Sequence, residues 1–255
     1  MELDEKNLII YTALIGQNEG LNRQPVFEKC KFRKICFTDD KELTSDDWEI
    51  RHVELILPSD NHRSQRNIKL RPHLLFTEFQ YSLYIDNTVV LKKPIKEFLE
   101  FINSQIGVNL PESQIFLPFH SFRETLIDEF NEVSKCELDD QMKFFEQLRD
   151  YSDGNLSILQ AKPYWPAIML RKHSASDIIN FSEIWFAHVN RYSRRDQLSI
   201  IAAADQANIK LNGFELDNHI SKYHKWPIHI AKREKRIFKQ KPIDNYLSAK
   251  LESQQ

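Results

Sequence analysis

The sequence predicts an α/β fold built around a largely parallel β-sheet. Short apolar segments typical of buried strands alternate with longer helical segments through the first hundred residues. The 255 residues suffice for one large domain, and the sequence contains no internal repeat, low-complexity segment or Gly/Ser-rich linker. Hydrophobic residues make up 41% and charged residues 28%, values that are ordinary for a globular protein.

Six segments have the features of strands, which are apolar or alternating runs bounded by polar or turn-forming residues. "NLIIYTALIG" is apolar up to Gly16, "KICFTDD" ends in two acidic residues, and "WEIRHVEL" alternates. "YSLYIDNTVVL" is interrupted by Asp86, "SQIFLPFH" ends in His120, and "YWPAIMLRKH" is apolar before a basic end. The strands are therefore expected over residues 7–16, 34–40, 48–55, 81–91, 113–120 and 164–173.

The remaining segments have helical periodicity. In "PIKEFLEFINSQI" the apolar residues recur on one face, and Pro94 occupies a favoured first-turn position. "NHRSQRNIKLRPHLLFTEF" is basic and then apolar, with a break expected at Pro72. The helices are expected over residues 61–79, 94–106, 124–135, 139–151, 175–192 and 195–207. We expect one domain over residues 1–230 and a basic, weakly structured extension over residues 231–255.

Charge is unevenly distributed along the chain. The net charge is −2, which indicates no general attraction to nucleic acid, so we expect no nucleic-acid partner. Between Lys222 and Lys250, however, nine Lys or Arg accompany only two acidic residues. This basic segment either contacts an anionic membrane surface, as a peripheral attachment, or is a solvated tail or a surface docked on the acidic main domain.

Several common classes are excluded by composition. No apolar run approaches the roughly 18 residues of a spanning helix, and the acidic N-terminus does not resemble a signal peptide. Cys30, Cys36 and Cys136 form neither a CxxC motif nor an even disulfide set, which favours a reducing compartment. We therefore expect a cytoplasmic protein, peripheral to the inner face of the membrane if the basic segment binds there. The five glycines form neither a GxGxxG nor a GxxxxGK[ST] loop, which excludes those nucleotide-binding motifs.

Polar side chains fall late in several predicted strands or directly after them. Thr12 lies late in the first strand, Asp39 ends the second, Asp86 interrupts another and His120 ends a later one. In an open α/β sheet, ligands bind beyond the carboxyl ends of the strands, so these residues are candidates for one site. Each also has an ordinary structural interpretation, such as a turn or cap for Asp39 and a satisfied structural histidine for His120.

Asp86 is the sharpest candidate because a carboxylate in an apolar strand is costly to bury without a partner. Either it binds a metal or a ligand, for example a divalent metal carrying a diphosphate, or it forms a salt bridge with a basic residue such as Arg66 or Lys69. Arg66 and Lys69 share a helical face that could meet phosphates, although a solvated face is the default interpretation of a basic run.

Two further groups are less specific. Asp196, followed by Gln197, begins the last predicted helix, where an acid is an ordinary cap but could also bind sugar hydroxyls. His219, His224 and His229 are five residues apart, which does not match the i, i+4 spacing of a helical zinc site. One of them could complete a metal shell, while surface histidines are the simpler interpretation.

The order of several short motifs resembles a glycosyltransferase-like family long catalogued as a domain of unknown function. The motifs are "YTALIG", "CFTDD", "WEI", "KLRPH", "YSLYIDNTVVLK", "HSFR", "MLRKH" and "RRDQLS". The family includes plant proteins linked to cell-wall polysaccharide and bacterial proteins from surface-polysaccharide loci. The resemblance runs from about residue 8 to residue 230, and the three elements K-x-x-P-H, I-D-N and R-D-Q-L-S in this order are together fairly specific.

The resemblance implies a GT-A-like fold, a Rossmann-type sandwich with a mostly parallel central sheet that binds a nucleotide-diphosphate sugar. It places Thr12 and Asp39 at the base and ribose, and Arg66 and Lys69 at the diphosphate. Asp86 takes the place of the metal-strand acid, with Asn87 beside it in the donor site. The sugar and the acceptor would be surrounded by His73, His120, Arg123, Asp196 and Gln197.

One departure from the family pattern concerns the metal. Where the fold commonly has Asp-x-Asp, residues 86–88 are Asp-Asn-Thr, so only the first acid is present. The expected cofactor is Mn²⁺ or Mg²⁺, bound by Asp86 together with His229 or His224. The alternative is that the basic run replaces the metal.

The resulting functional hypothesis is a glycosyltransferase. It would move a sugar from a nucleotide-diphosphate donor, taken as a UDP-sugar, to a glycan or lipid-linked glycan acceptor in surface polysaccharide synthesis. Arg66, Lys69 and an Asp86-bound cation would stabilise the leaving diphosphate, and Asp196 would act as base or hold a sugar hydroxyl. Two alternatives remain, which are a binding module of the same fold without transfer activity and a glycan or lipid hydrolase using Asp86 and Asp196 as paired carboxylates.

Overall fold

The structure is a computed structural model that describes residues 3–16, 20–106 and 115–226. Its centre is a seven-stranded sheet with the order β3-β2-β1-β4-β7-β6-β8, and β5 and β9 form a separate pair. The strands are β1 Leu8–Leu14, β2 Lys34–Thr38, β3 Glu49–His52, β4 Tyr81–Ile85, β5 Val90–Leu91, β6 Ile115–Pro118, β7 Ile168–Arg171, β8 Asn212–Phe214 and β9 His224–Lys225.

The sheet is mostly parallel, as predicted. The pairs β3–β2, β2–β1, β1–β4 and β6–β8 are parallel, whereas β7 is antiparallel to both of its neighbours, β4 and β6. The strands on both sides of β7 therefore point the same way, and their carboxyl ends lie along one edge of the sheet. β7 is reversed, so its amino end lies at that same edge.

Helices form at the expected places; the differences are a short helix over Ser157–Gln160 that was not predicted and a division of the last predicted helix. The α-helices are α1 Asn61–Leu70, α2 Ile95–Ile106, α3 Leu126–Lys135, α4 Gln141–Gly154, α5 Ser157–Gln160, α6 Ser176–Arg191 and α7 Ile200–Ala207. The 3₁₀ turns are η1 Pro25–Phe27, η2 Pro72–Leu74 and η3 Asp196–Leu198. The break expected at Pro72 in the segment 61–79 is confirmed, since α1 ends at Leu70 and Pro72 disfavours an α conformation at Arg71. The helix predicted over 195–207 is divided into η3 and α7.

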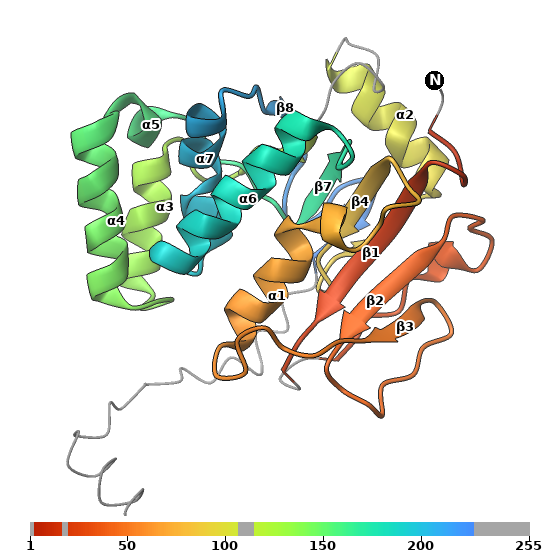
Figure 1. Cartoon of the computed structure of the whole chain (residues 1–255). Coiled ribbons are helices and arrows are strands. Elements are labelled where there is room, and N and C mark those ends of the chain that lie inside the picture. Colours follow the sequence, from red (N-terminus) through yellow and green to blue (C-terminus); the bar gives the residue numbers. More distant parts are fainter. Residues whose placement is uncertain (1–2, 17–19, 107–114, 227–255) are drawn as a thin grey trace, which may run out of the picture.

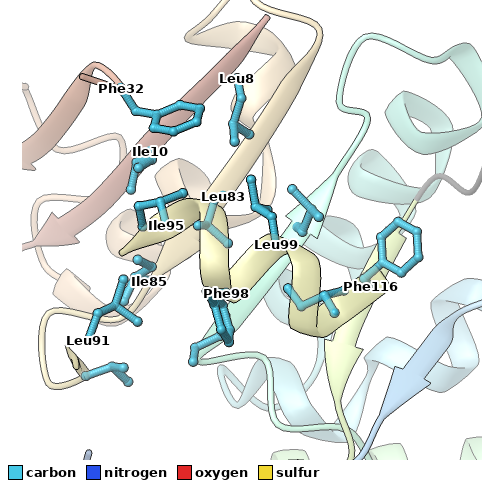
Figure 2. Packing of buried hydrophobic residues seen from close by; sticks show 14 of the residues in the cluster. Leu8, Ile10, Phe32, Leu83, Ile85, Leu91, Ile95, Phe98, Leu99 and Phe116 are labelled. Atoms are coloured by element: carbon cyan, nitrogen blue, oxygen red, sulfur yellow. The ribbon is translucent and has the colours of Figure 1, made fainter. Parts of the chain in front are cut away.

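The helices cover both faces of the sheet (Figure 1). Leu8 and Ile10 of β1 face α2 and pack with Phe98, and Figure 2 shows this layer from close by. Tyr11 points to the opposite face, where Ile68 of α1 joins apolar residues of α6 and α7. Alternation along a strand thus assigns successive residues of β1 to two different apolar layers.

A third apolar cluster joins α3, α4 and α5 to the rest of the domain. Phe130 of α3 and Phe144 of α4 pack with Leu198 of η3 and Ala202 of α7. Figure 1 shows these three helices grouped to one side of the sheet, next to α7. This packing matters for the site because it places α3 directly against the turn that contains Asp196.

Two predictions fall outside the described residues. These are the basic extension over residues 231–255, including its membrane contact, and the proposed metal ligand His229. Within the ranges that the structure does describe, no helix has the length and apolar character needed to span a bilayer.

Gly16 shapes the carboxyl end of β1. Its backbone N–H donates to Asp39 Oδ1 at 2.9 Å, which ties the end of β1 to the end of β2. Its φ of +73° is in the left-handed region, and a Cβ built there would lie 2.2 Å from Nδ2 of Asn61, the first residue of α1. This position therefore requires glycine on both conformational and steric grounds.

We expect Gly16→Ala to lower the free energy of unfolding by about 1–3 kcal/mol, because a side chain in the left-handed region is strained. Chemical denaturation of the purified variant measures this. Gly20→Ala is the matched control, because a Cβ at Gly20 meets no atom within 4 Å. Equal stabilities of the two variants would contradict the role assigned to Gly16.

Candidate functional site

The candidate site lies at the carboxyl edge of the sheet. Asp86 directly follows β4, and its backbone N–H donates to the carbonyl of Ala167 at 2.8 Å, just before the reversed strand β7. Along the same edge, Asp39 follows β2 on one side of Asp86, and His120 follows β6 on the other. Asp86 therefore occupies a central place on the edge at which α/β sheets bind ligands.

A buried lysine connects Asp86 to a second carboxylate. Lys69 of α1 has only 2% of its side chain exposed. Its Nζ lies 2.7 Å from Asp196 Oδ2 and 3.5 Å from Asp86 Oδ1. The same ammonium lies 5.0 Å from the centroid of the Tyr84 ring. Lys69 thus links α1, the end of β4 and η3 through one charge, with an aromatic ring beneath it.

Asp86 has hydrogen-bond and ion-pair partners but is not fully buried. Tyr84 donates its hydroxyl hydrogen to Asp86 Oδ1 at 2.7 Å, and Gln65 Nε2 donates to the Tyr84 oxygen at 2.7 Å. Burial, and secondarily the charge of Asp86, raise the pKa of Tyr84 well above its usual range, so Tyr84 stays a neutral donor. The Asp86 side chain is still 27% exposed, which leaves part of the carboxylate accessible to a ligand.

Asp196 is almost completely buried between two cations. Arg66 Nε lies 3.1 Å from Asp196 Oδ1, on the opposite oxygen from Lys69. Burial alone would raise the pKa of Asp196, but the charges of Arg66 and Lys69 outweigh it and lower the pKa to about 2. Trp185 Nε1 of α6 also donates to the Asp196 carbonyl at 3.0 Å. Asp196 is therefore ionised at neutral pH and is held by α1 and α6.

A buried arginine holds the end of α1 that carries Lys69. Arg171 of β7 is fully buried and donates to the carbonyl of Leu70 at 3.2 Å. It also donates to the carbonyl of Lys69 and to the hydroxyl of Tyr11, which itself donates to the Lys69 carbonyl at 2.7 Å. These bonds satisfy the last carbonyls of α1 with a positive charge, where the helix dipole favours one. They also anchor the backbone of Lys69 to β1 and β7.

A second polar cluster lies next to the first. Glu129 of α3 is buried, with His120 Nε2 at 3.7 Å, Arg123 Nε at 3.5 Å and Arg195 at 3.6 Å. Burial, together with Arg123 and Arg195, lowers the pKa of His120 to about 4, so His120 is neutral at pH 7. Burial raises the pKa of Glu129, and Arg195 and Arg123 oppose that shift. The 3.7 Å contact is therefore not an ion pair at neutral pH.

The two clusters meet at the turn that begins η3. Arg195 contacts Glu129 in one cluster, while the next residue, Asp196, contacts Lys69 in the other. The side chain of Arg195 also donates to Gln197 Oε1 at 3.3 Å. Charged residues from α1, β4, α3 and η3 thus form one continuous polar network at the carboxyl edge.

Comparison with known proteins identifies the family of this domain. The TOD1/MUCI70 glycosyltransferase-like domain matches residues 18–227, most of the chain. The chain belongs to the TOD1/MUCI70 glycosyltransferase-like family. The resemblance noted from the sequence motifs is thereby confirmed.

One curated relative is the "Probable hexosyltransferase MUCI70" of Arabidopsis thaliana. It is 25% identical over 205 residues, which cover 78% of this chain and 35% of the relative. The chain thus spans about a third of the length of that relative.

A solved glycosyltransferase shares the fold. The apo structure of the WbbM bifunctional glycosyltransferase aligns with a TM-score of 0.50 and 11% identity, over 85% of this chain and 40% of that one. Mouse xyloside xylosyltransferase 1 in its apo form aligns with a TM-score of 0.46 and 10% identity, over 84% of this chain and 88% of that one. At 11% identity the alignment with WbbM concerns the fold alone, and the predicted GT-A-like α/β fold is confirmed.

In this glycosyltransferase-like domain, several predicted site residues converge. Asp86, Lys69, Arg66 and Asp196 form the first cluster, and His120, Arg123 and Gln197 lie in or beside the second. The two interpretations of Asp86 given above are not exclusive in the structure. Its nearest cation is Lys69, one of the two partners named from the sequence, and its carboxylate is nevertheless partly exposed.

Other predicted residues lie outside the two clusters. Thr12 is fully buried within β1, and its Oγ1 has no hydrogen-bond partner among the residues that the structure describes. His73 lies on η2, where its Nε2 is 2.8 Å from Glu183, and burial lowers its pKa. Asp39 bonds the backbone of Gly16, and the Asn87 carbonyl accepts a hydrogen bond from Asn22 at 2.7 Å. Their roles in donor binding stay predictions.

The side chains described around Asp86 do not by themselves form a metal site. In the described part of the chain, no group of three or more His, Cys, Asp or Glu is placed to hold a metal ion. Thr88 Oγ1 accepts a hydrogen bond from Trp226, and Lys69 already stands beside Asp86. His224 is fully buried, with Ser221 at 2.8 Å from its Nδ1. Of the residues expected to hold the metal, Asp86 is partly exposed and His224 is buried. The third, His229, lies outside the described ranges.

Three functional residues escaped the sequence analysis. Glu129, Arg171 and Arg195 were not predicted, although each organises one of the clusters. Arg171 and Arg195 lie within the motifs "MLRKH" and "RRDQLS", which offered a signal for them. Glu129 lies on an ordinary amphipathic helix, and only the packing of α3 against η3 reveals its place.

We expect Asp196→Asn to lower the free energy of unfolding by about 3–5 kcal/mol, because it removes one charge from a buried network. Urea denaturation at pH 7 measures the change. Glu49→Gln serves as control, because Glu49 pairs with Arg33 at the surface, where both side chains are more than 40% exposed and solvent screens the pair. A loss no larger than that of the control would contradict a buried ion-pair network.

The pH dependence gives the same prediction a second readout. The pKa of Asp196 is about 2 in the folded state, against an ordinary value of 3.8. Its stabilisation is therefore complete above the unfolded pKa and is lost as pH falls through the folded pKa. The stability difference between the wild type and Asp196→Asn should narrow below about pH 4. If the difference in unfolding free energy stays constant from pH 7 to pH 3, the destabilisation of Asp196→Asn comes from altered packing and not from the lost charge.

Proposed function

We propose that this domain transfers a hexosyl group from a nucleoside-diphosphate sugar, taken as a UDP-sugar, to a glycan acceptor in surface polysaccharide synthesis. Family membership and the hexosyltransferase name of the Arabidopsis relative support the transferase class. The observation that carries the proposal is Asp86, a partly exposed carboxylate at the carboxyl edge of the sheet with a buried lysine behind it. This is the position at which an α/β sheet presents groups to a ligand.

The chemical demand of such a reaction is charge stabilisation. When the glycosidic bond to the donor breaks, the departing nucleoside diphosphate gains negative charge, and a preorganised cation lowers the barrier. An ammonium has three N–H donors, one more than the two carboxylates that Lys69 contacts here. We assign the third to a phosphate oxygen of the donor. The contact to Asp86 is the longer of the two, so it is the one that a phosphate would alter first.

Asp196 suits a positioning role better than a proton-transfer role. A general base needs a pKa near the working pH, whereas the pKa of Asp196 is about 2 and each of its oxygens faces a cation. Its burial argues against a hydrolase that uses Asp86 and Asp196 as a pair, because the Asp196 side chain is only 5% exposed and a cation already lies against each of its oxygens. We assign Asp196 to holding Arg66 and Lys69 in place.

We expect Asp86→Ala and Asp86→Asn to reduce transfer about 100- to 1,000-fold while leaving the fold intact, because Asp86 positions the Lys69 ammonium that would stabilise the leaving diphosphate. Transfer or slow hydrolysis of UDP-hexoses measures activity, and circular dichroism checks folding. Asp46→Asn is the control, since the Asp46 side chain is 85% exposed. Unchanged turnover in the Asp86 variants would remove Asp86 from the site.

Donor identity and metal dependence are tested together by thermal shift. Metal-free protein is heated with UDP-glucose, UDP-galactose, UDP-N-acetylglucosamine or GDP-mannose, with and without Mn²⁺ or Mg²⁺. A bound donor at about 100 times its Kd should raise the Tm by about 5 °C or more. We expect UDP-sugars to be effective and GDP-mannose not. A Tm shift that requires Mn²⁺ would support the predicted metal. A full Tm shift in EDTA would mean that Lys69 and Arg66 neutralise the diphosphate in place of a metal. No shift with any donor would contradict the proposed function.

A further inference from the structure

A row of three near-parallel aromatic rings borders the candidate site. Phe122 and His219 stack with ring centroids 4.6 Å apart and planes 17° apart, and His219 and Trp226 stack at 5.6 Å and 21°. Phe122 is 40% exposed, His219 is also exposed and Trp226 is half-buried. We call Phe122, His219 and Trp226 the aromatic row. Large exposed aromatics are unusual enough on a protein surface to indicate binding when they gather at one place.

The aromatic row contacts residues at the carboxyl edge of the sheet at both of its ends. Trp226 Nε1 donates to Thr88 Oγ1 at 3.1 Å, two residues from Asp86. Phe122 meets the ring of His120 edge-on, with centroids 4.6 Å apart, and Arg123 lies over the Phe122 ring at 5.6 Å. The row therefore connects the turn after β4 to the second polar cluster and lies within reach of both.

A buried hydrogen-bond network holds the row in place. Asn218 is fully buried, accepts from the backbone N–H of Ser121 at 2.8 Å and donates to the carbonyl of Phe119 at 3.0 Å. The adjacent loops that carry Phe122 and His219 are thus fixed to each other. Trp226 is fixed by its backbone N–H, which donates to the His219 carbonyl at 2.7 Å. A binding surface that is fixed beforehand loses less entropy when it takes a ligand.

The position of the row indicates which substrate it serves. Asp39 follows β2 and the row follows β6 and β8, so the two lie on opposite sides of Asp86 along the edge. If the donor nucleotide extends from Asp86 towards Asp39, the row is left for the other substrate. We propose that the aromatic row is an acceptor subsite that binds a pyranose unit of a glycan, an inference that rests on the proposed function.

The chemistry of the row suits a sugar. A pyranose has apolar C–H faces that pack on aromatic rings and a rim of hydroxyls that need hydrogen-bond partners. Around the row, the imidazole of His219 and the guanidinium of Arg123 supply polar groups, and the Asp217 side chain, which accepts from the backbone N–H of His219 at 2.8 Å, is exposed. This combination of exposed rings and a polar rim matches a carbohydrate more closely than a purely apolar ligand.

The test measures binding of defined tetrasaccharides to the full-length protein. Cellotetraose, xylotetraose, mannotetraose and β-1,4-galactotetraose are titrated by calorimetry and saturation-transfer NMR. We expect at least one to bind, and Phe122→Ala or His219→Ala to weaken it about 3- to 10-fold. Phe122→Tyr, which keeps a ring, should retain binding. Phe145→Ala, which removes a 53% exposed phenylalanine on α4, is the matched control and should change nothing.

Two outcomes would overturn the acceptor subsite. One is that none of the four tetrasaccharides binds the wild type, and the other is that Phe122→Ala binds as tightly as the wild type. UDP-hexose binding is measured in the same variants to separate the two proposals. Intact donor binding without ring-dependent tetrasaccharide binding would reject the subsite alone. Ring-dependent tetrasaccharide binding without any donor binding would reject the proposed transferase and leave a glycan-binding surface. Loss of UDP binding in Phe122→Ala would assign the row to the nucleotide instead.

Discussion

The candidate site depends on the position of one buried ammonium group. Lys69 brings its positive charge to Asp196 and Asp86, which belong to segments more than a hundred residues apart in the chain. A charge buried to this extent is tolerated only when partners compensate it. Arg171 fixes the backbone of Lys69 at the end of α1, and Arg66 shares Asp196 with it. The fold around this ammonium is thus organised so that a single cation stands behind the exposed carboxylate.

The sequence allowed the fold to be predicted more fully than the site. Strand and helix periodicity placed the main elements, because local apolar patterns follow directly from which faces are buried. The reversal of β7 was not predicted, since an apolar run such as "YWPAIMLRKH" shows that a strand is buried and says nothing of its direction. The break after α1 was anticipated from Pro72, because the chemistry of proline is local.

For the site, residue types were easier to predict than pairings. Asp86 was selected because a carboxylate inside an apolar strand is visible in the sequence alone. The Arg66–Lys69 face was selected because basic residues three apart are visible there too. That both cations turn to Asp196 depends on η3 packing against α1, a contact between distant segments that periodicity does not encode. Glu129 illustrates the limit, since nothing distinguishes it from the other acidic residues of α3 until Arg195 and His120 are placed around it.

The departure from Asp-x-Asp has a structural counterpart in this chain. Thr88 stands where the second acid would be, and its hydroxyl accepts the hydrogen bond of Trp226, so this position connects the Asp86 turn to the aromatic row. An acidic side chain at residue 88 would place a second negative charge near Asp86 while Lys69 already divides its charge between two carboxylates. With no acid at residue 88, the two cations Lys69 and Arg66 face two carboxylates, Asp86 and Asp196. The turn after β4 therefore joins a charge from α1 on one side to the aromatic row on the other, and the link to the row is the hydrogen bond that Thr88 accepts from Trp226.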